Sequence, residues 1–145
     1  MRTWAGWIGA ALVLSACGSS TDVEIDPAVE PFVGTWDAVA FTVTGDDPPH
    51  TVVDVLTLGP FWIRVEPSGS YQAVLEFLGG QAEFGKLTVQ SSTVLILDAN
   101  DDPPAPSTYV FATTDSLVMD GATEFDFNLD GTDEPGQAHI EIVRR

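Results

Sequence analysis

Basic residues are scarce in this chain of 145 residues, because five Lys and Arg stand against 22 Asp and Glu, giving a formal net charge of −17 at pH 7. Such a chain is repelled by the phosphates of nucleic acids and by anionic lipid surfaces, so we expect no nucleic-acid partner. The sequence also holds a single cysteine, Cys17, which excludes an intramolecular disulfide. Its length suits one domain with one core and is too short for two.

Long hydrophobic runs are missing as well. The extended apolar stretch from Trp4 to Leu14 follows the cation Arg2. It is shorter than the roughly 20 residues that a permanent transmembrane helix needs, which is typical of a secretory signal peptide. An ordinary secretory signal followed by a chance cysteine, or a buried core helix, would share this apolar run.

The next residues, Leu14-Ser15-Ala16-Cys17, resemble the lipobox of bacterial lipoproteins. The resemblance implies that residues 1–16 are a signal peptide that is removed and that Cys17 receives acyl chains such as palmitate. Two or more acyl chains anchor a protein stably, so the protein would be held at the membrane of the cell envelope without spanning it. Gly18 resembles the pattern that sorts lipoproteins to the outer membrane in bacteria with two membranes. We expect residues 17–31, which carry four acids and two prolines, to be the lipidated cysteine and an acidic tether.

From Phe32 onward the 3.6-residue period of amphipathic helices is almost absent. Short runs rich in Val, Ile, Thr, Phe and Tyr are instead separated by Gly, Pro, Asp, Asn and Ser, which is typical of all-β proteins. We predict strands over Val33–Thr44, Phe61–Glu66, Ser70–Leu78, Glu83–Gln90, Thr93–Asp98, Thr108–Ala112, Ser116–Asp120, Thr123–Asn128 and Ala138–Arg144. The stretch Val52–Leu58 fits either a short strand or a helical turn, and Asp120-Gly121 is expected to form a tight turn.

Apolar and polar residues alternate along these runs, which turns one face of each strand inward. Many consecutive antiparallel strands with one buried face close most economically into a small up-and-down β-barrel, because closure removes exposed edges. A two-sheet β-sandwich is the alternative. In the first strand, Trp36 and the run of Val39, Phe41 and Val43 fall on opposite faces, so a bulge near Asp37 is needed to turn both inward.

The start of this strand, Phe32-Val33-Gly34-Thr35-Trp36, resembles the Gly-x-Trp signature that opens the lipocalins and the smaller bacterial lipocalin-like domains. The resemblance covers residues 32–145 and implies a lipocalin-like barrel that binds a small apolar ligand. It also implies that a cation of the last strand packs over the tryptophan and closes the base of the barrel. By strand parity we expect Arg144 to be that partner of Trp36, in a cation–π contact worth about 0.5–2 kcal/mol.

A second pattern, from Asp126 to Glu134, resembles the Asp-x-Asn-x-Asp-Gly calcium loop of EF-hands. The resemblance implies calcium as a bound ion, held by side-chain oxygens. These would come from Asp126, Asn128, Asp130 and Glu134. Gln137, however, stands where a bidentate Glu normally lies, and both flanks are predicted strands. A polar hairpin with an Asp-Gly turn explains the same residues without a metal, and no other cofactor is expected.

Patterns of enzyme active sites are missing from the sequence. His50 and His139 lack the His, Cys or carboxylate neighbours of zinc and nucleophile sites, and no Gly-rich phosphate loop follows a strand. We therefore expect a binding protein rather than an enzyme: a membrane-anchored lipocalin-like lipoprotein that takes up a small apolar ligand at the cell envelope. The alternative is a structural or interaction module with a packed barrel and acidic, calcium-binding loops, in which Trp62 is an exposed aromatic residue of a partner surface.

Overall fold

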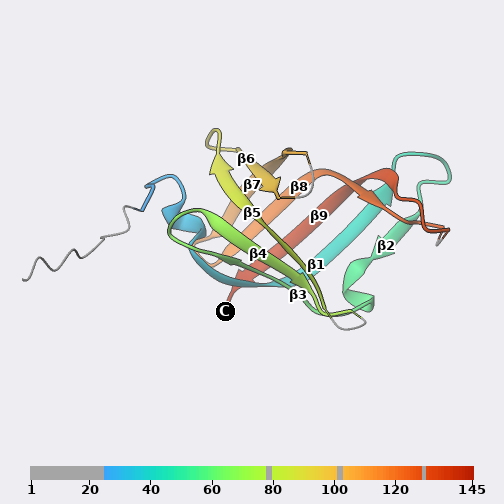
Figure 1. Cartoon of the computed structure of the whole chain (residues 1–145), viewed down its shortest axis with the longest axis horizontal. Coiled ribbons are helices and arrows are strands. Elements are labelled where there is room, and N and C mark those ends of the chain that lie inside the picture. Colours follow the sequence, from blue (N-terminus) through green and yellow to red (C-terminus); the bar gives the residue numbers. More distant parts are fainter. Residues whose placement is uncertain (1–24, 78–79, 101–102, 129) are drawn as a thin grey trace, which may run out of the picture.

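The computed structural model describes residues 25–77, 80–100, 103–128 and 130–145. The expected signal peptide, the lipidation site Cys17 and the first part of the tether lie outside these residues. Among the residues that are described, no helix is long and apolar enough to cross a membrane. The elements, in chain order, are the 3-10 helix η1 (Glu30–Phe32), β1 (Gly34–Gly45), β2 (Val52–Asp54), the 3-10 helix η2 (Val55–Thr57), β3 (Phe61–Val65), β4 (Ser70–Leu75), β5 (Gln81–Val89), β6 (Val94–Ala99), β7 (Ala105–Thr113), β8 (Ser116–Phe125) and β9 (Glu134–Arg144) (Figure 1).

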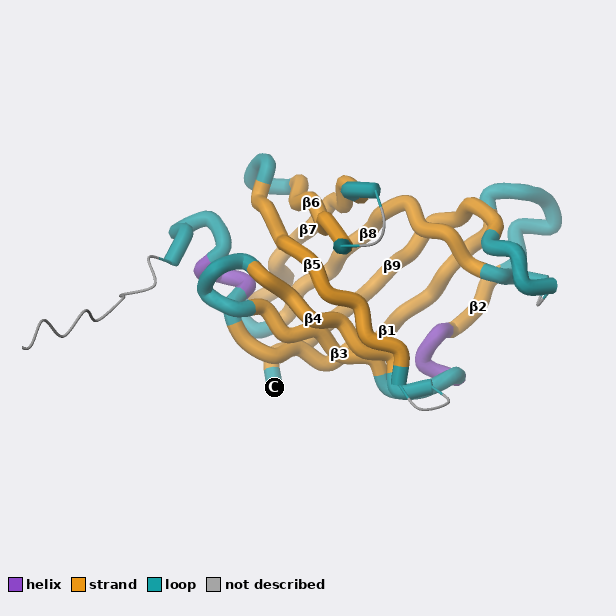
Figure 2. The backbone as a smooth tube through the Cα atoms, in the orientation of Figure 1, coloured by secondary structure: helices purple, strands orange, loops and turns teal. Residues whose placement is uncertain are grey.

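Eight of the strands close into an antiparallel barrel. Consecutive strands from β3 to β9 pair with one another, and β1 pairs with both β3 and β9, which completes the circle (Figure 2). The remaining strand, β2, pairs with the far end of β1 at Thr42, Val43 and Thr44. The predicted up-and-down barrel is confirmed, and the β-sandwich is wrong because a sandwich would leave two separate sheets. The strand pairings that close the barrel join residues between Gly34 and Arg144.

The first strand contains the bulge that the sequence requires. The register between β1 and β9 shifts between Ala38 and Ala40. Trp36 therefore faces inward before the bulge, and Phe41 faces inward after it. Val39 is the residue that the irregularity turns outward, with 56% of its surface exposed. The expected bulge lies close to Asp37, but the placement of Val39 on the inner face is wrong.

Two further sequence predictions are corrected in β8. The separate strands expected over Ser116–Asp120 and Thr123–Asn128 form one strand, so Asp120-Gly121 is not a turn. A Cβ atom at Gly121 would lie 2.5 Å from Oγ of Ser107, its partner on β7. The glycine thus permits a close approach of two strands, which a single sequence does not distinguish from a turn. The ambiguous stretch Val52–Leu58 contains both expected forms, since β2 runs directly into η2.

One end of the barrel is filled by its own side chains, and we call it the closed end. Phe32 of η1 inserts there, with its ring centroid 5.1 Å from those of both Tyr109 and Phe111. Val29, which was expected to belong to the tether, is buried in the same cluster, so the folded region begins before Phe32. The opposite end, which holds the β1–β2 and β8–β9 loops, is called the open end (Figure 1).

Candidate functional site

At the closed end, Trp36 and Arg144 lie together in the arrangement that the lipocalin resemblance implies. The guanidinium carbon of Arg144 is 4.2 Å from the centroid of the Trp36 ring. The indole is almost fully buried, and its Nε1 donates a hydrogen bond of 2.8 Å to the carbonyl oxygen of Phe32. This pair seals the barrel base and leaves little of the tryptophan for a ligand.

The burial of inward side chains changes along the barrel. Near the closed end they are fully buried, as for Val65, Leu95, Leu117 and Ile142. Toward the open end Val43 is still buried, but five other inward apolar side chains are only half-buried. These are Phe41, Phe61, Leu75, Phe125 and Ile140. The inner surface is therefore apolar at both ends but is covered by the protein itself at only one of them.

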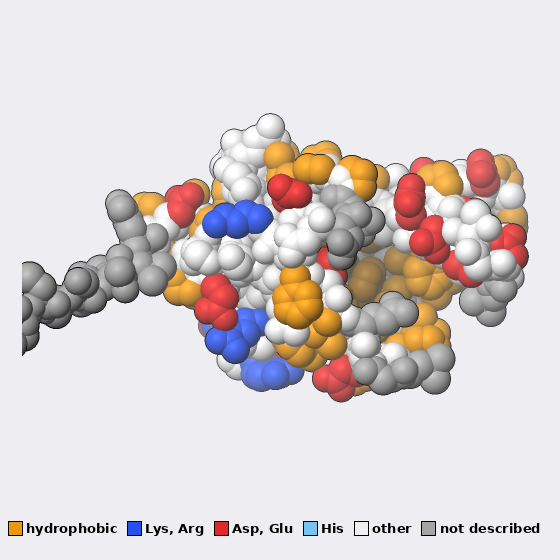
Figure 3. Space-filling model, in the orientation of Figure 1, with side chains coloured by type: hydrophobic (Ala, Val, Ile, Leu, Met, Phe, Trp, Pro, Cys, Tyr) orange, Lys and Arg blue, Asp and Glu red, His pale blue; other side chains and the backbone are white. Residues whose placement is uncertain are grey.

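The cause of this exposure is the unequal length of the strands. β7 pairs with β8 only as far as Ser107 and Gly121, whereas β8 continues to Phe125 and β9 runs alongside it. The wall made by β6 and β7 is therefore short, and the interior opens both at the side and at the end. Figure 3 shows a hollow at this place with hydrophobic side chains on its floor. We call it the trough, lined by the five half-buried side chains named above.

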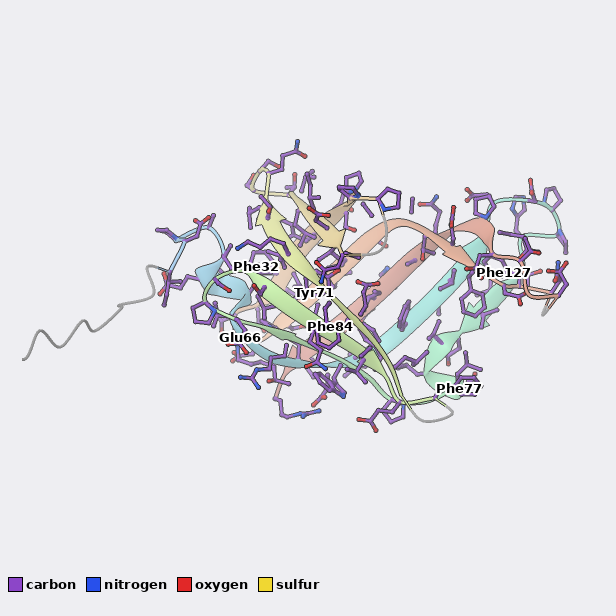
Figure 4. The ribbon with its side chains drawn as sticks, viewed as in Figure 1. Phe32, Glu66, Tyr71, Phe77, Phe84 and Phe127 are labelled. Carbon is purple, nitrogen blue, oxygen red and sulfur yellow. The ribbon has the colours of Figure 1, made fainter. Side chains whose placement is uncertain are left out.

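Aromatic pairs line the trough on two sides. The rings of Phe41 on β1 and Phe61 on β3 meet edge to face, with centroids 5.0 Å apart. Phe125 packs on Phe127 with centroids 5.2 Å apart. Figure 4 shows Phe127 over the far ends of β1 and β9, with Phe77 also at the open end, and Phe32 at the opposite end. Two open pockets of the described chain lie away from the trough, one against the outer face of β7 and β8 and one beneath the closed end.

A polar pair stands where the packed core meets the trough. The hydroxyl of Tyr71 donates a hydrogen bond of 2.5 Å to Oε1 of Glu83. Tyr71 is buried, whereas Glu83 is exposed. Gly85 makes this possible, since a Cβ atom there would lie 2.8 Å from the tyrosine ring and 2.3 Å from the carbonyl oxygen of Asp98. Glu83 is not among the site residues that the sequence predicts, although it stands in step with Gly85 and Leu87 of the same strand.

The β8–β9 loop brings the expected calcium ligands together. One carboxylate oxygen from each of Asp126, Asp130 and Glu134 lies within 4.8 Å of the others. Asn128 joins them, since its Nδ2 donates to Oε1 of Glu134. Backbone amides also donate to these carboxylates, as from Gly131 to Oδ2 of Asp126 at 2.9 Å. The loop thus offers the oxygens that calcium prefers and also the hydrogen bonds of a polar hairpin.

The expected exposed aromatic, Trp62, is half-buried on the outer face of β3. Its Nε1 donates a hydrogen bond of 3.0 Å to Oε1 of Glu76. Phe84 on β5 is more exposed, at 52% of its surface (Figure 4). Both side chains lie outside the barrel and do not contribute to the trough.

Charge is distributed unevenly over the molecule. The Lys and Arg residues of the described chain lie at the closed end or on the outer face near it, and Figure 3 shows those of one face gathered there. They are Arg64, Lys86, Arg144 and Arg145. Acidic residues crowd the loops of the open end, including Asp46, Asp47 and the β8–β9 loop. Arg145 donates to Asp37 at 3.0 Å, and this hydrogen bond lowers the pKa of the Asp37 carboxyl.

His139, the histidine on β9, lies outside the barrel. Its Nδ1 is 2.6 Å from Oδ1 of Asp120, and its Nε2 is 3.3 Å from Oε1 of Glu141. These hydrogen bonds, that to Asp120 first, raise the pKa of the imidazole above its ordinary value of 6.5. The cluster is a surface feature of the β8–β9 pair and is remote from the inner face.

Comparison with known proteins finds similarity among solved structures. No protein-family model matches the sequence, and no curated protein matches it. Among solved structures, the chain is similar to lobster apocrustacyanin A1, a lipocalin, with a TM-score of 0.46 and 12% sequence identity. The match covers 80% of this chain and 62% of that one, so the chain spans less than two thirds of the length of that protein. The all-β barrel described above is established by its own strand pairing.

Proposed function

We propose that this protein is a lipid-anchored binding protein of the cell envelope that holds a small apolar ligand in the trough. The observation that carries the proposal is the half-buried state of inward side chains such as Phe41, Phe61 and Ile140. Small eight-stranded barrels either fill their interior with side chains or hold one small ligand. Here the closed end is filled and the open half is not. A ligand that covered the trough would gain about 25 cal/mol for each Å² of apolar surface it buried.

The position of the chain start supports the anchored arrangement. The described chain begins at Ile25, at the closed end of the barrel (Figure 1). From Cys17 to Ile25 an extended chain reaches about 28 Å at most. A lipid on Cys17 would therefore keep the closed end near the membrane and leave the trough facing away from it. The Gly18 that follows the cysteine favours the outer membrane where a cell has two membranes.

Binding of an apolar probe tests the proposal. An unacylated chain that begins at Gly18 keeps every described contact of the barrel and avoids detergent. Titration with N-phenyl-1-naphthylamine should give a saturable rise in fluorescence. Phe61→Ala should weaken probe binding about tenfold, because it removes an apolar wall of the trough. Phe84→Ala makes the same change on the outer face and should leave binding unchanged, with circular dichroism showing that both variants are folded.

The alternative of an interaction module is favoured by one observation, that the pockets against the outer face of β7 and β8 and beneath the closed end both lie outside the trough. Under that alternative the wild-type protein would show no saturable probe binding. Equal loss of binding in Phe61→Ala and Phe84→Ala would likewise contradict a ligand site in the trough. Native mass spectrometry of the protein purified from its own membrane then reports a bound lipid, a metal ion or a protein partner directly.

A further inference from the structure

We infer that the trough selects apolar ligands whose polar head is a hydrogen-bond donor, above all an amine, and discriminates against carboxylates. This inference rests on the proposed ligand-binding function and assigns the head-group site to Glu83. The five side chains that define the trough are aromatic and aliphatic, and such side chains bind a tail without regard to its head group. A single placed polar group in such a site decides orientation and specificity.

The strand register places Glu83 on the inner face. Tyr71 pairs with Gly85, and Ala73 pairs with Glu83 on the same pair of strands. Tyr71 and Ala73 are both buried members of the core. Residues 83, 85 and 87 of β5 therefore point inward together, and Leu87 is buried at the deep end of this row. Glu83 is exposed. The described pairing of β6 with β5 ends at Ala99 and Gly85, followed by one hydrogen bond of 3.0 Å from the backbone amide of Asn100 to the carbonyl oxygen of Phe84.

Tyr71 fixes the carboxylate without exhausting its capacity to bind. Its ring lies over Gly85, and its hydroxyl donates to one carboxylate oxygen of Glu83. An ionised carboxylate offers about four lone-pair positions for donors, so the exposed group can accept further hydrogen bonds. An amine has donors and a positive charge, and its alkyl tail would extend over Ala73 toward Phe61 and Leu75. The pair thus fits a ligand with one donating head and one apolar tail.

The positions of the described cations also favour a positively charged ligand over a negatively charged one. Arg64 and Lys86 stand on the outer faces of β3 and β5, since their strand neighbours Val65 and Leu87 face inward. Arg144 covers Trp36 beneath the closed end, and Arg145 binds Asp37. None of these four described cations lines the trough. A carboxylate head would therefore meet Glu83 without a compensating cation, which is unfavourable at short range.

A matched set of ligands tests this inference. Decylamine, decanol and decanoate share one tail and differ in the head group, and each would compete with N-phenyl-1-naphthylamine on the unacylated chain. We expect decylamine to displace the probe at about fivefold lower concentration than decanol, and decanoate to be the weakest of the three. Glu83→Gln should bring decylamine and decanol within about twofold of each other, because the isosteric amide keeps the shape and removes the charge.

The variant Glu124→Gln is the control for a general attraction of cations to an acidic protein. Glu124 is exposed on β8, where its neighbours Thr123 and Phe125 face the other side of the sheet. This variant loses the same single charge on the outer face and should keep the full preference for decylamine. Tyr71→Phe provides a second variant, in which the carboxylate remains and the preference for the amine should persist.

The outcomes separate the two proposals. If the probe binds and the three ligands compete equally, the head-group inference is wrong and the ligand-binding function stands. If Glu83→Gln and Glu124→Gln reduce the preference equally, overall charge is the cause and the inference is again wrong. If the probe does not bind at all, the proposed function itself fails.

Discussion

Arg144 lies directly opposite Trp36 in the β1–β9 pairing and places its guanidinium carbon 4.2 Å from the centroid of the indole ring. The same guanidinium donates to the carbonyl oxygens of Pro31 and Val33. It also pairs with Asp115, at 3.0 Å between Nε and Oδ1. One side chain therefore joins the chain before β1, the last strand and the β7–β8 turn.

Replacing Arg144 tests this closure. We expect Arg144→Ala to lower the free energy of unfolding by about 2–3 kcal/mol, because it removes a cation–π contact and several charged hydrogen bonds. Arg144→Lys should recover only a minor part of the lost free energy of unfolding. An ammonium lacks the planar fork with which a guanidinium reaches carbonyl oxygens and a carboxylate at once. Urea unfolding followed by tryptophan fluorescence measures both. Arg145→Ala is the control, because its exposed pair with Asp37 should matter less, and a Lys variant as stable as wild type would contradict the geometric role.

The barrel could be predicted because it depends on short-range patterns, and the contact of a terminal cation with Trp36 was implied by the lipocalin resemblance. Alternation within single strands identified the inward residues of β3, β4 and β9. The conflict between Trp36 and the following apolar run required a bulge, which the structure places between Ala38 and Ala40. Parity along the last strand then pointed to Arg144 as the cation over the indole.

The features that could not be predicted depend on the register between strands. In the sequence Gly121 looks like a turn residue. Only the structure shows that it pairs with Ser107, which lies too close for a side chain at this position. In the sequence Glu83 looks like an ordinary solvent-facing residue. The pairing of β5 with the short β6 shows that it lies on the inner face of β5, beyond the last paired residue Gly85. The open trough likewise follows from unequal strand lengths, since the end of β7 against β8 is set by pairing across the sheet. No local pattern in one sequence carries this information.

The stability of the protein should depend on pH through His139. Hydrogen bonds to Asp120 and Glu141 raise the pKa of its imidazole above 6.5 in the folded state. The stabilisation by the protonated ring is complete below the ordinary pKa and is lost as pH rises through the raised one. Because the pair is exposed, we expect at most about 1 kcal/mol of stability to be lost in this way.

The measurement is a comparison of wild type with His139→Gln between pH 5.5 and pH 8.5, by urea unfolding. The stability difference should shrink as pH rises, and any contribution from His50 cancels because both proteins contain it. Asp120→Asn should lower the midpoint of the His139 ring titration followed by NMR. A stability difference that grows with pH would have the wrong sign for this interaction.

The stability of the β8–β9 loop should depend on the side chain of Asp126. Its two carboxylate oxygens accept hydrogen bonds from the backbone amides of Asp130, at 3.1 Å, and Gly131, at 2.9 Å. Asp126→Ala removes both, and we expect it to cost about 1–2 kcal/mol of stability in the absence of metal. Asp133→Ala, an exposed acid of the same loop, is the control and should have a smaller effect.

Calcium titration separates the two interpretations of this loop. If the oxygens of Asp126, Asp130 and Glu134 hold calcium, calorimetry shows a saturable site and the melting temperature rises with the ion. Asp130→Ala should then abolish both effects. If the loop is a polar hairpin alone, calcium and a chelator leave the melting temperature of the wild-type protein unchanged.

The lipid anchor is tested at Cys17. Cys17→Ser removes the thiol that would carry the acyl chains, and the wild-type protein should fractionate with membranes while the variant does not. Charge attraction does not offer an alternative route to the membrane, because a chain with a net charge of −17 is repelled by anionic lipid surfaces. Ser19→Ala is the control, since it changes a hydroxyl two residues away and leaves the lipobox intact. Wild-type-like fractionation of Cys17→Ser would refute the lipid anchor while leaving the proposed ligand-binding trough untouched, because the strand pairings that close the barrel join residues between Gly34 and Arg144.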